Sequence, residues 1–404
     1  MSLYLMQIKG WVHKVRDLGK IKFLLIRDGY KIMQAVIKKG ESPDYLLDLD
    51  IPIESAVEIE GEERETNGKK EILVKDLKIL AKAEPLPIDP KKATPKKRFD
   101  YRIIDLKLPE RQTLFRLRAK VQKFFRDWFM ENGFVEINTP KIVIIGAESG
   151  AEVFPVLYFG KEAYLTQSPQ LYKQMMVSVF PKVFEIAFAY RAEPSRTSRH
   201  LAEFTSVDAE MGFIKDEYDV INTIKKMLID VSEKAMQTKE FEELAKPIDL
   251  GFEIITFDEA KEIVKGNPNE DLTTEEERKL GEHFMEEGVS FVAVTKYPWS
   301  ERPFYTMRLD DNPSYTRGFD IIFRGLEIIS GAQREHRYEK LLENIKEKGI
   351  DPNKLEYYLM AFKYGMPPHG GFGLGLERYL RQLLGLDDVR EVILFYRDID
   401  RLLP

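Results

Sequence analysis

The sequence predicts an α+β protein in which a small N-terminal β-barrel precedes a larger domain built on an antiparallel sheet. Two observations support this. Roughly the first eighty residues consist of short strand-like segments bounded by Gly, Asp and Asn, and a proline-rich basic segment follows them. Beyond that segment, helical stripes alternate with paired strands, as in a domain with its own sheet and covering helices.

Length and composition restrict the class of protein. A chain of 404 residues can form two or three domains, each with a core, and 43% hydrophobic with 32% charged residues is typical of globular proteins. No apolar run approaches the roughly 20 residues of a membrane span. Residues 1–7 lack a basic start followed by an apolar core. We therefore expect no secretory signal, no membrane and a cytoplasmic location.

The absence of cysteine excludes disulfides, a thiolate nucleophile and Cys-ligated metal sites. With five histidines in the chain, any metal is expected to be a hard cation on carboxylates. The net charge of -6 argues against non-specific coating of DNA but permits local basic patches.

Residues 1–82 predict an OB-type barrel, a fold that binds single-stranded nucleic acid or sugar chains or serves as a purely structural barrel. Its strand-like segments are 7–12, 22–28, 31–37, 56–61 and 71–74. Phe23, near Lys22 and Arg16, could stack on and clamp an unpaired base. Residues 83–108 read as a linker, and its basic run 91–98 favours a solvated hinge, with phosphate contact as the alternative.

Residues 109–404 form the second predicted domain. An apolar stripe from Leu114 to Trp128 predicts a helix that Gly133 terminates, and the strand after it ends at Pro140. The loop 145–152 contains glycines that could hinge over a site. Gln170 and Lys173 lie three residues apart near the start of the next helix, so both can point the same way.

Two strand pairs follow. Residues 183–191 and 204–211 predict antiparallel partners joined by a polar loop. Residues 318–331 form two strand-like runs broken at Gly325, and Asp320 and Glu327 can converge only if Gly325 bends the chain. Between the two strand pairs, the segment of about 240–290 is predicted to be a peripheral helical insertion, with capping boxes from Thr256 to Glu259 and from Thr274 to Glu277.

The segment 364–378 predicts a nucleotide site. Gly371, Gly373 and Gly375 recur at period two, so one face of an extended strand carries no side chains and a flat ligand could rest on the backbone. From Leu376 the apolar period becomes helical, and Arg378 is held beside the glycines. A Rossmann site is excluded because no βαβ unit precedes these glycines. The alternative is a glycine-rich turn before an ordinary helix.

Three of these stretches resemble motifs 1, 2 and 3 of class II aminoacyl-tRNA synthetases: helix, strand and Pro140; strand, Arg191, loop and Phe204; and Gly371 to Arg378. With the barrel, the chain resembles the aspartate, asparagine and lysine subgroup. The segments 167–174, 191–193, 199–201, 330–336 and 366–371 make it most similar to the archaeal-type aspartyl enzymes. The resemblance implies formation of aspartyl-adenylate from L-aspartate and ATP, transfer to tRNA(Asp), and a homodimer that pairs through motif 1.

By this resemblance, Arg191 grips the α-phosphate and Arg378 the γ-phosphate, and Arg378 and Phe204 cover the two faces of the adenine. Glu193 touches the adenine amino group and His200 the outer phosphates. The matching ATP-binding positions also include Arg199, Leu201, Glu327, Gly371, Gly373 and Gly375. The reaction needs positioning and charge neutralisation rather than a protein nucleophile, so Arg191, Arg378 and Glu327 are the expected catalytic residues.

The resemblance also implies the amino-acid and metal positions. Lys173 and Arg334 match the cations that bind the aspartate side chain. Asp208, Gln170 and Glu148 match the positions that hold or screen its ammonium group. Ser330 completes the expected aspartate-binding set. Asp320, Glu327 and Ser330 match the family's Mg²⁺ positions, and two carboxylates and a hydroxyl suit that hard cation.

In the barrel, Phe23, Gln34 and Arg16 match positions that stack on and read the central anticodon base. His13 occupies a position that is often tryptophan in strict enzymes and histidine in relaxed ones, which also charge tRNA(Asn). Histidine here favours the relaxed form. Tyr396 and the Leu-Leu-Pro terminus depart from the family pattern.

Three rival hypotheses remain open from the sequence. The first is an asparaginyl-tRNA synthetase, against which Lys173 argues. The second is an asparagine synthetase derived from the same fold, whose relatives lack the barrel. The third is a non-catalytic RNA-binding paralogue, which would be expected to lose Arg191, Arg378 or Glu327, and all are present.

Overall fold

The computed structural model describes residues 5–29, 31–66, 68–144, 152–195 and 197–403. The chain divides into two compact units, Met1–Ala93 and Thr94–Pro404, each described here by itself. Within the described ranges, no helix combines the length and the apolar character needed to cross a membrane.

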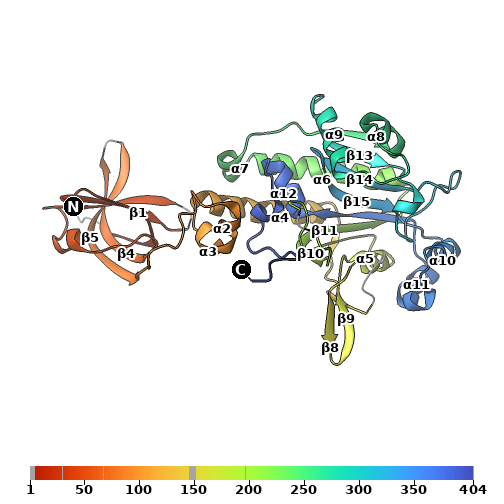
Figure 1. The fold of residues 1–404 in the computed structure, drawn as a ribbon, viewed down its shortest axis with the longest axis horizontal. Helices are drawn as coiled ribbons and strands as arrows, with labels where there is room; N and C mark the ends of the chain where they lie inside the picture. The colour runs from red at the N-terminus through yellow and green to blue at the C-terminus, as the bar shows by residue number, and fades with distance from the viewer. Residues whose placement is uncertain (1–4, 30, 67, 145–151, 196, 404) are drawn as a thin grey trace. The chain divides into compact units, whose positions relative to one another are not determined.

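The first unit, coloured red to orange in Figure 1, is a closed barrel. Its strands follow the order β1, β2, β3, β5, β4. The strands are β1 (Leu5–Asp17), β2 (Ile21–Arg27), β3 (Ile32–Lys38), β4 (Ala56–Thr66) and β5 (Lys69–Ala81), and the short helix α1 (Tyr45–Asp48) lies between β3 and β4. Alternate residues such as Val12, Leu24, Ile26 and Ala35 fill its core. The prediction of an OB-type barrel is confirmed.

The second unit is built on one large sheet, with strand order β12, β13, β14, β15, β16, β11, β10, β6. Its strands are β6 (Val135–Glu136), β10 (Lys182–Tyr190), β11 (Glu203–Gly212), β12 (Gly251–Thr256), β13 (Val289–Thr295), β14 (Gly318–Phe323), β15 (Leu326–Gln333) and β16 (His369–Gly375). The middle of the sheet is antiparallel as predicted, whereas β12 with β13 and β10 with β6 pair in parallel. A separate small sheet joins β7 (Ile142–Val143), β8 (Pro155–Tyr158) and β9 (Lys161–Leu165).

Helices surround this sheet. They are α2 (Pro95–Asp100), α3 (Arg102–Asp105), α4 (Pro109–Glu131), α5 (Gln170–Val177), α6 (Glu217–Met236), α7 (Lys239–Leu244), α8 (Phe257–Val264), α9 (Thr274–Met285), α10 (Tyr338–Glu347), α11 (Glu356–Lys363) and α12 (Leu376–Leu384), with 3₁₀ helices η1 (Trp299–Glu301), η2 (Pro352–Leu355) and η3 (Val389–Val392). The main core joins apolar residues of α4, α6 and α12 to one face of the sheet, which leaves the opposite face for function. As predicted, α12 ends at Gly385, whose φ of 64° is left-handed.

Two predictions require correction. The segment 240–290 is not only helical, because β12 lies within it and extends the large sheet. The capping box of α8 uses Thr256 and Glu259 as predicted, but that of α9 uses Thr273 and Glu276, one residue earlier than expected. Glu277 is thereby released for another contact, described below.

The basic run 91–98 is only partly a solvated segment. Its lysines are exposed, but Arg98 is buried and pairs with Asp105 and Glu391. Tyr396, the departure from the family pattern, is also buried, and its ring meets that of Phe99 edge to face at 5.3 Å. Arg401 donates to the Tyr396 hydroxyl at 2.8 Å, so the tyrosine has a complete local environment.

Candidate active site

Three neighbouring strands, β15, β16 and β11, form the base of the site, and the pleat explains which side chains face it. On β11, Val207 and Ala209 face the core while Phe204, Ser206 and Asp208 face the opposite side. On β16, Phe372 and Leu374 face the core. The intervening glycines therefore present bare backbone on the functional face, as the sequence predicted.

The register places Gly373 between two polar side chains. It pairs with Ser330 of β15 on one side and with Asp208 of β11 on the other. A Cβ at Gly373 would lie 3.0 Å from the Asp208 carboxylate, which is tighter than ordinary contact. Gly371 pairs with Glu210, and a Cβ there would lie 2.1 Å from a Glu210 oxygen. Gly373 and Gly375 line the cavity described next. Gly371 lies against Glu210 and is not among the residues that line this cavity.

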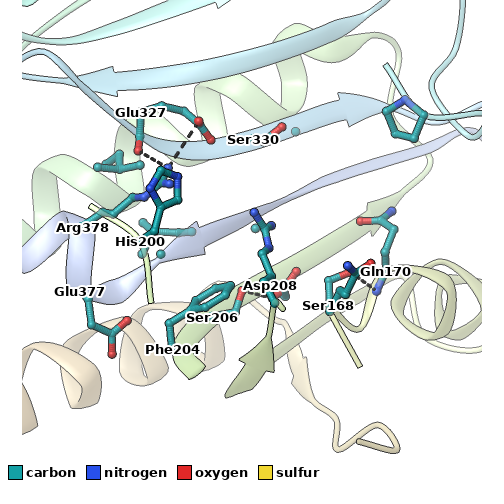
Figure 2. A pocket seen from close by; sticks show the side chains of 18 of the residues that line it. Ser168, Gln170, His200, Phe204, Ser206, Asp208, Glu327, Ser330, Glu377 and Arg378 are labelled. Atoms are coloured by element: carbon teal, nitrogen blue, oxygen red, sulfur yellow. Dashed lines mark hydrogen bonds and ion pairs between the residues drawn. The ribbon is translucent and has the colours of Figure 1, made fainter. Parts of the chain in front are cut away.

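A cavity of about 220 Å³ lies over these strands. Figure 2 shows Glu327 and Ser330 reaching it from one strand, and Phe204, Ser206 and Asp208 from another. Most of the residues expected to bind ATP or aspartate line it: Gln170, Arg191, Glu193, Arg199, His200, Leu201, Phe204, Asp208, Glu327, Ser330, Arg334, Gly373, Gly375 and Arg378. Glu148 lies outside the described residues. The expected convergence of motifs 2 and 3 on one cavity is therefore observed.

A β-bulge explains how Glu327 and Ser330 both reach the cavity. Residues three apart on a regular strand face opposite sides. Here the register between β14 and β15 shifts, because Ile321 pairs with Ile329 while the next residue, Ile322, pairs with Glu327. The bulge turns Glu327 towards the cavity. The chain reverses at Arg324 and Gly325, with φ of 48° and 83°, so Gly325 does bend the chain as predicted.

We call one part of the cavity the open end: Arg191, Glu193, His200, Phe204 and Arg378. Arg191 is 47% exposed, lies 3.8 Å from Glu193, and stands over the Phe204 ring at 5.4 Å. His200 forms hydrogen bonds with Thr197 and Ser195 through Nδ1. Burial, and then the charge of Arg378, lower the pKa of His200, so its neutral form is favoured at neutral pH.

Arg378 lies in the first turn of α12 and is held by contacts with Glu327 and Arg199. Its Nη1 donates to the Glu327 carbonyl at 3.0 Å and approaches the Glu327 carboxylate at 3.4 Å, and its Nε donates to the Arg199 carbonyl at 3.3 Å. Arg199 itself donates to both Glu277 oxygens, at 2.8 and 2.9 Å. Burial, and then the charge of Glu327, raise the pKa of Glu277. Sequence reasoning missed Glu277 because it assigned that residue to the helix cap.

We call the other part the buried end: Gln170, Lys173, Asp208, Glu210 and Arg334. Lys173 is 1% exposed and donates to Asp208 at 2.9 Å and to the Phe372 carbonyl at 2.7 Å. Glu210 accepts from Arg334 Nε at 2.9 Å and lies 3.7 Å from the Lys173 ammonium. Lys173, expected to touch the substrate directly, is not among the cavity-lining residues and sits behind them.

Two donors at the buried end remain for a ligand. Arg334 uses Nε and Nη2 on Glu210 and Gln170, and its Nη1 has no partner among the described residues. Gln170 accepts from Arg334 through Oε1, which leaves its Nε2 group buried without an acceptor in the described part of the chain. A free N–H suits an oxygen acceptor of a ligand. The ammonium-binding role expected of Gln170 from the sequence stays a prediction.

Glu210 was not found from the sequence, although a signal existed. It follows Phe204, Ser206 and Asp208 at period two on β11, so the pleat alone places it on the functional face. It is 0% exposed and orients both buried-end cations. A buried carboxylate on that face was therefore predictable, but its partners were not.

The expected metal positions are only partly presented. Asp320 gives both oxygens to Arg302, at 3.0 and 2.6 Å, and Arg302 also donates to Ser330 at 3.1 Å. Asp320 is thus held in an ion pair rather than free as a ligand. No cluster of three or more acidic or histidine side chains suited to a metal occurs in the described ranges. Glu327 and Ser330 offer hard oxygen donors on the cavity wall and fit Mg²⁺ if phosphate oxygens complete its shell.

In the barrel, the anticodon residues predicted from the sequence share the outer face of β1, β2 and β3. Arg16 pairs with Phe23, and Gln34 pairs with Leu25, two residues from Phe23 on the same face. Gln34 donates to Glu71 at 2.8 Å. His13 is the extra residue of a bulge in β1, and its Nδ1 lies 3.6 Å from a Glu54 oxygen.

Comparison with known proteins agrees with this geometry. Residues 94–398 match the family described as tRNA synthetases class II (D, K and N), and residues 6–80 match the OB-fold nucleic acid binding domain. The chain therefore belongs to the class II tRNA synthetases of the D, K and N group. It is an aminoacyl-tRNA synthetase, an ATP-dependent ligase.

Its relatives narrow the subgroup. The chain is 44% identical to the aspartate–tRNA(Asp/Asn) ligase of Aeropyrum pernix, over 98% of this chain and 95% of that one. It is 45% identical to the aspartate–tRNA(Asp) ligase of Thermococcus kodakarensis, over 98% and 96%. The solved asparaginyl-tRNA synthetase of Pyrococcus horikoshii, complexed with asparaginyl-adenylate, has a TM-score of 0.93 at 32% identity, over 100% and 97%. The resemblance to archaeal aspartyl enzymes is confirmed.

Proposed function

We propose that this protein activates L-aspartate with ATP and transfers the aspartyl group to tRNA(Asp) and to tRNA(Asn). The observation that carries the choice of aspartate is the buried end, where Arg334 Nη1 and Gln170 Nε2 are donors without acceptors among the described residues. Fold similarity cannot make this choice, because an asparaginyl enzyme superposes with a TM-score of 0.93.

Charge explains the selection of aspartate over asparagine. Aspartate carries a carboxylate where asparagine carries a neutral amide, and a charge-assisted hydrogen bond from a guanidinium is roughly twice as strong as a neutral one. Arg334 supplies the direct contact, and Lys173, behind it, holds the Asp208 carboxylate in place. Asp208 lines the cavity beside Ser206 and accepts the substrate ammonium group.

The first chemical step is in-line attack of the aspartate α-carboxylate on the α-phosphorus, with pyrophosphate as the leaving group. Arg191 neutralises charge on the α-phosphate while Phe204 supports the adenine ring. Arg378, on the rigid start of α12, and neutral His200 hold the outer phosphates. In the second step the 3′-hydroxyl of the terminal adenosine attacks the activated carbonyl and AMP leaves.

Glu327 and Ser330 would hold Mg²⁺ together with phosphate oxygens. When bound, the ion supplies charge neutralisation on the phosphates. Asp320 acts differently from the sequence expectation: it anchors Arg302, which in turn fixes the Ser330 hydroxyl.

The exposed face of the barrel reads the anticodon. Phe23 stacks on an unpaired base, and Arg16 and Gln34 contact it from the neighbouring strands. Relatives named for tRNA(Asp) alone and for both tRNAs are about equally identical to this chain. The proposal that tRNA(Asn) is also charged therefore depends on His13.

We further propose a homodimer that pairs through the motif 1 helix α4 and strand β6. The outer side of this region carries exposed apolar side chains, including Met130 at 60% and Val135 at 41%. Sedimentation of the purified chain measures this directly, and a single monomeric species would contradict it.

Amino-acid-dependent exchange of pyrophosphate into ATP tests the activation step. We expect exchange with aspartate and little with asparagine or lysine, while exchange driven only by asparagine would overturn the proposal.

Charging of purified tRNA(Asn) with aspartate tests the relaxed specificity. We expect wild-type enzyme to charge it and His13→Trp to charge it less, with tRNA(Asp) as the matched control; complete absence of charging in the wild type would reject the relaxed form.

A further inference from the structure

A second cavity, of about 330 Å³, lies in the catalytic unit next to the open end. It has no role in the function proposed so far. We call it the arginine pocket. Four arginines, Arg199, Arg278, Arg324 and Arg381, are among its lining residues, and Asp387 is the single acidic residue of that lining in the described part of the chain. Such an excess of positive charge in a concave site favours an anionic ligand.

Two of these arginines, Arg324 and Arg381, form no ion pair in the described ranges, although the charges of Asp388 and Asp387 act on Arg381. Arg324 donates from Nη1 to the Gln382 carbonyl at 3.2 Å, and Arg381 donates from Nε to the Leu386 carbonyl at 3.0 Å. Arg278, by contrast, pairs with Glu275 and Glu282. Arg324 and Arg381 therefore retain most of their donors, in the planar geometry that binds phosphate oxygens in pairs.

Arg199 connects this pocket to the active site, because it is a lining residue of both cavities. It is nine-tenths buried, with 9% of its side chain exposed, and its Nη2 is bound to Glu277. Its Nε is buried and has no acceptor among the described residues. A buried guanidinium donor without an acceptor costs stability unless a ligand satisfies it.

Packing of α12 against its neighbours does not by itself account for the arginines of this pocket. Burial lowers the pKa of Arg381, while the charge of Asp388, the next largest influence, acts in the opposite direction. A fold that needed these arginines only for packing would gain by pairing them with carboxylates, as it does for Arg278.

We propose that the arginine pocket binds inorganic pyrophosphate as it leaves the active site. This rests on the proposed function, in which pyrophosphate is formed at the open end, with Arg199 in the shared wall and the Arg199 carbonyl bonded to Arg378. Pyrophosphate carries several negative charges and oxygens enough for more than one guanidinium. It fits this site better than a nucleic-acid strand, because the pocket and the active-site cavity share the lining residue Arg199.

Calorimetric titration with pyrophosphate tests the proposal. We expect two sites in the wild type, with Arg378→Gln weakening only the active-site one and Arg324→Gln with Arg381→Gln weakening only the other. Each lost guanidinium should reduce affinity by roughly tenfold or more. Lys340→Gln, which removes an exposed lysine paired with Glu343, is the matched control for loss of one positive charge and should retain both sites.

Titration with inorganic phosphate in parallel shows whether the pocket needs the diphosphate, and we expect weaker binding. One site in the wild type, or a second site that persists in the double variant, overturns the proposal. If the double variant does not fold, Arg324→Gln alone gives the same comparison. Aspartate-dependent exchange is followed separately: its absence in the wild type would defeat the proposed function, whereas the number of pyrophosphate sites concerns only the pocket.

Discussion

The two ends of the active-site cavity are built in different ways. At the buried end, Lys173, Asp208, Glu210 and Arg334 neutralise one another through short contacts, and each is less than a twentieth exposed. At the open end, Arg191 is about half exposed and its nearest carboxylate is 3.8 Å away. The buried end is preorganised before any ligand arrives, whereas the open end is completed by its ligand.

This difference separates stability from catalysis. Paired charges in the interior destabilise a protein strongly when one partner is removed, while exposed pairs contribute little. Substitutions at the buried end should therefore reduce both folding stability and activity. Substitutions at the open end should reduce activity alone.

The largest effect is expected for Lys173→Met. The change leaves Asp208 without its cation in the interior, which should lower the free energy of unfolding by about 3 to 5 kcal/mol. Chemical denaturation measures this, and aspartate-dependent exchange should fall as well. A variant as stable as the wild type would contradict the view that the buried end is a coupled charge cluster.

Arg191→Gln is the matched change at the open end. We expect kcat/KM for exchange to fall by about 10² to 10³-fold, since a charge-stabilising donor is lost in the transition state. The free energy of unfolding should change by less than about 0.5 kcal/mol, as for an exposed residue. Loss of stability comparable to that of Lys173→Met would remove the distinction between the two ends.

A pH titration of His369 sharpens the same comparison. His369 lies behind the buried end, where its carbonyl accepts from the Arg334 backbone N–H at 2.8 Å, and burial lowers its pKa to about 4. The unfolded chain takes up this proton near pH 6.5, but the folded chain does not until about pH 4. Protonation therefore favours unfolding, and stability falls as pH decreases between these values.

From about pH 7 to about pH 4.5 this histidine should cost roughly 2 to 3 kcal/mol of stability. Denaturation of wild type and His369→Gln at both pH values isolates the contribution. The variant should lose less stability on acidification, and an equal loss in both proteins would show that His369 is not the group responsible.

Local patterns were sufficient to predict much of this architecture. The period-two glycines predicted the bare face of β16, the helical period after Leu376 predicted α12, and the strand ending at Arg191 predicted the β10–β11 pair. Each of these features depends on residues close together in the sequence, where the pleat or the helical repeat fixes which side chains share a face.

The charge partners could not be predicted in the same way. Arg302 pairs with Asp320, Arg199 with Glu277, and Arg334 with Glu210, and in each pair the fold brings together residues that are far apart in the sequence. The bulge that turns Glu327 into the cavity likewise depends on pairing with β14. Sequence spacing alone carries neither kind of information, so Asp320 was expected to be a free ligand.

The affinity of two non-hydrolysable adenylate analogues, aspartyl and asparaginyl, tests the central claim most directly. They differ only at the group that should meet Arg334 and Gln170. A charged hydrogen bond exceeds a neutral one by about 1 to 2 kcal/mol, so the account predicts roughly 5- to 30-fold tighter binding of the aspartyl analogue. Equal affinities, or tighter binding of the asparaginyl analogue, would contradict it.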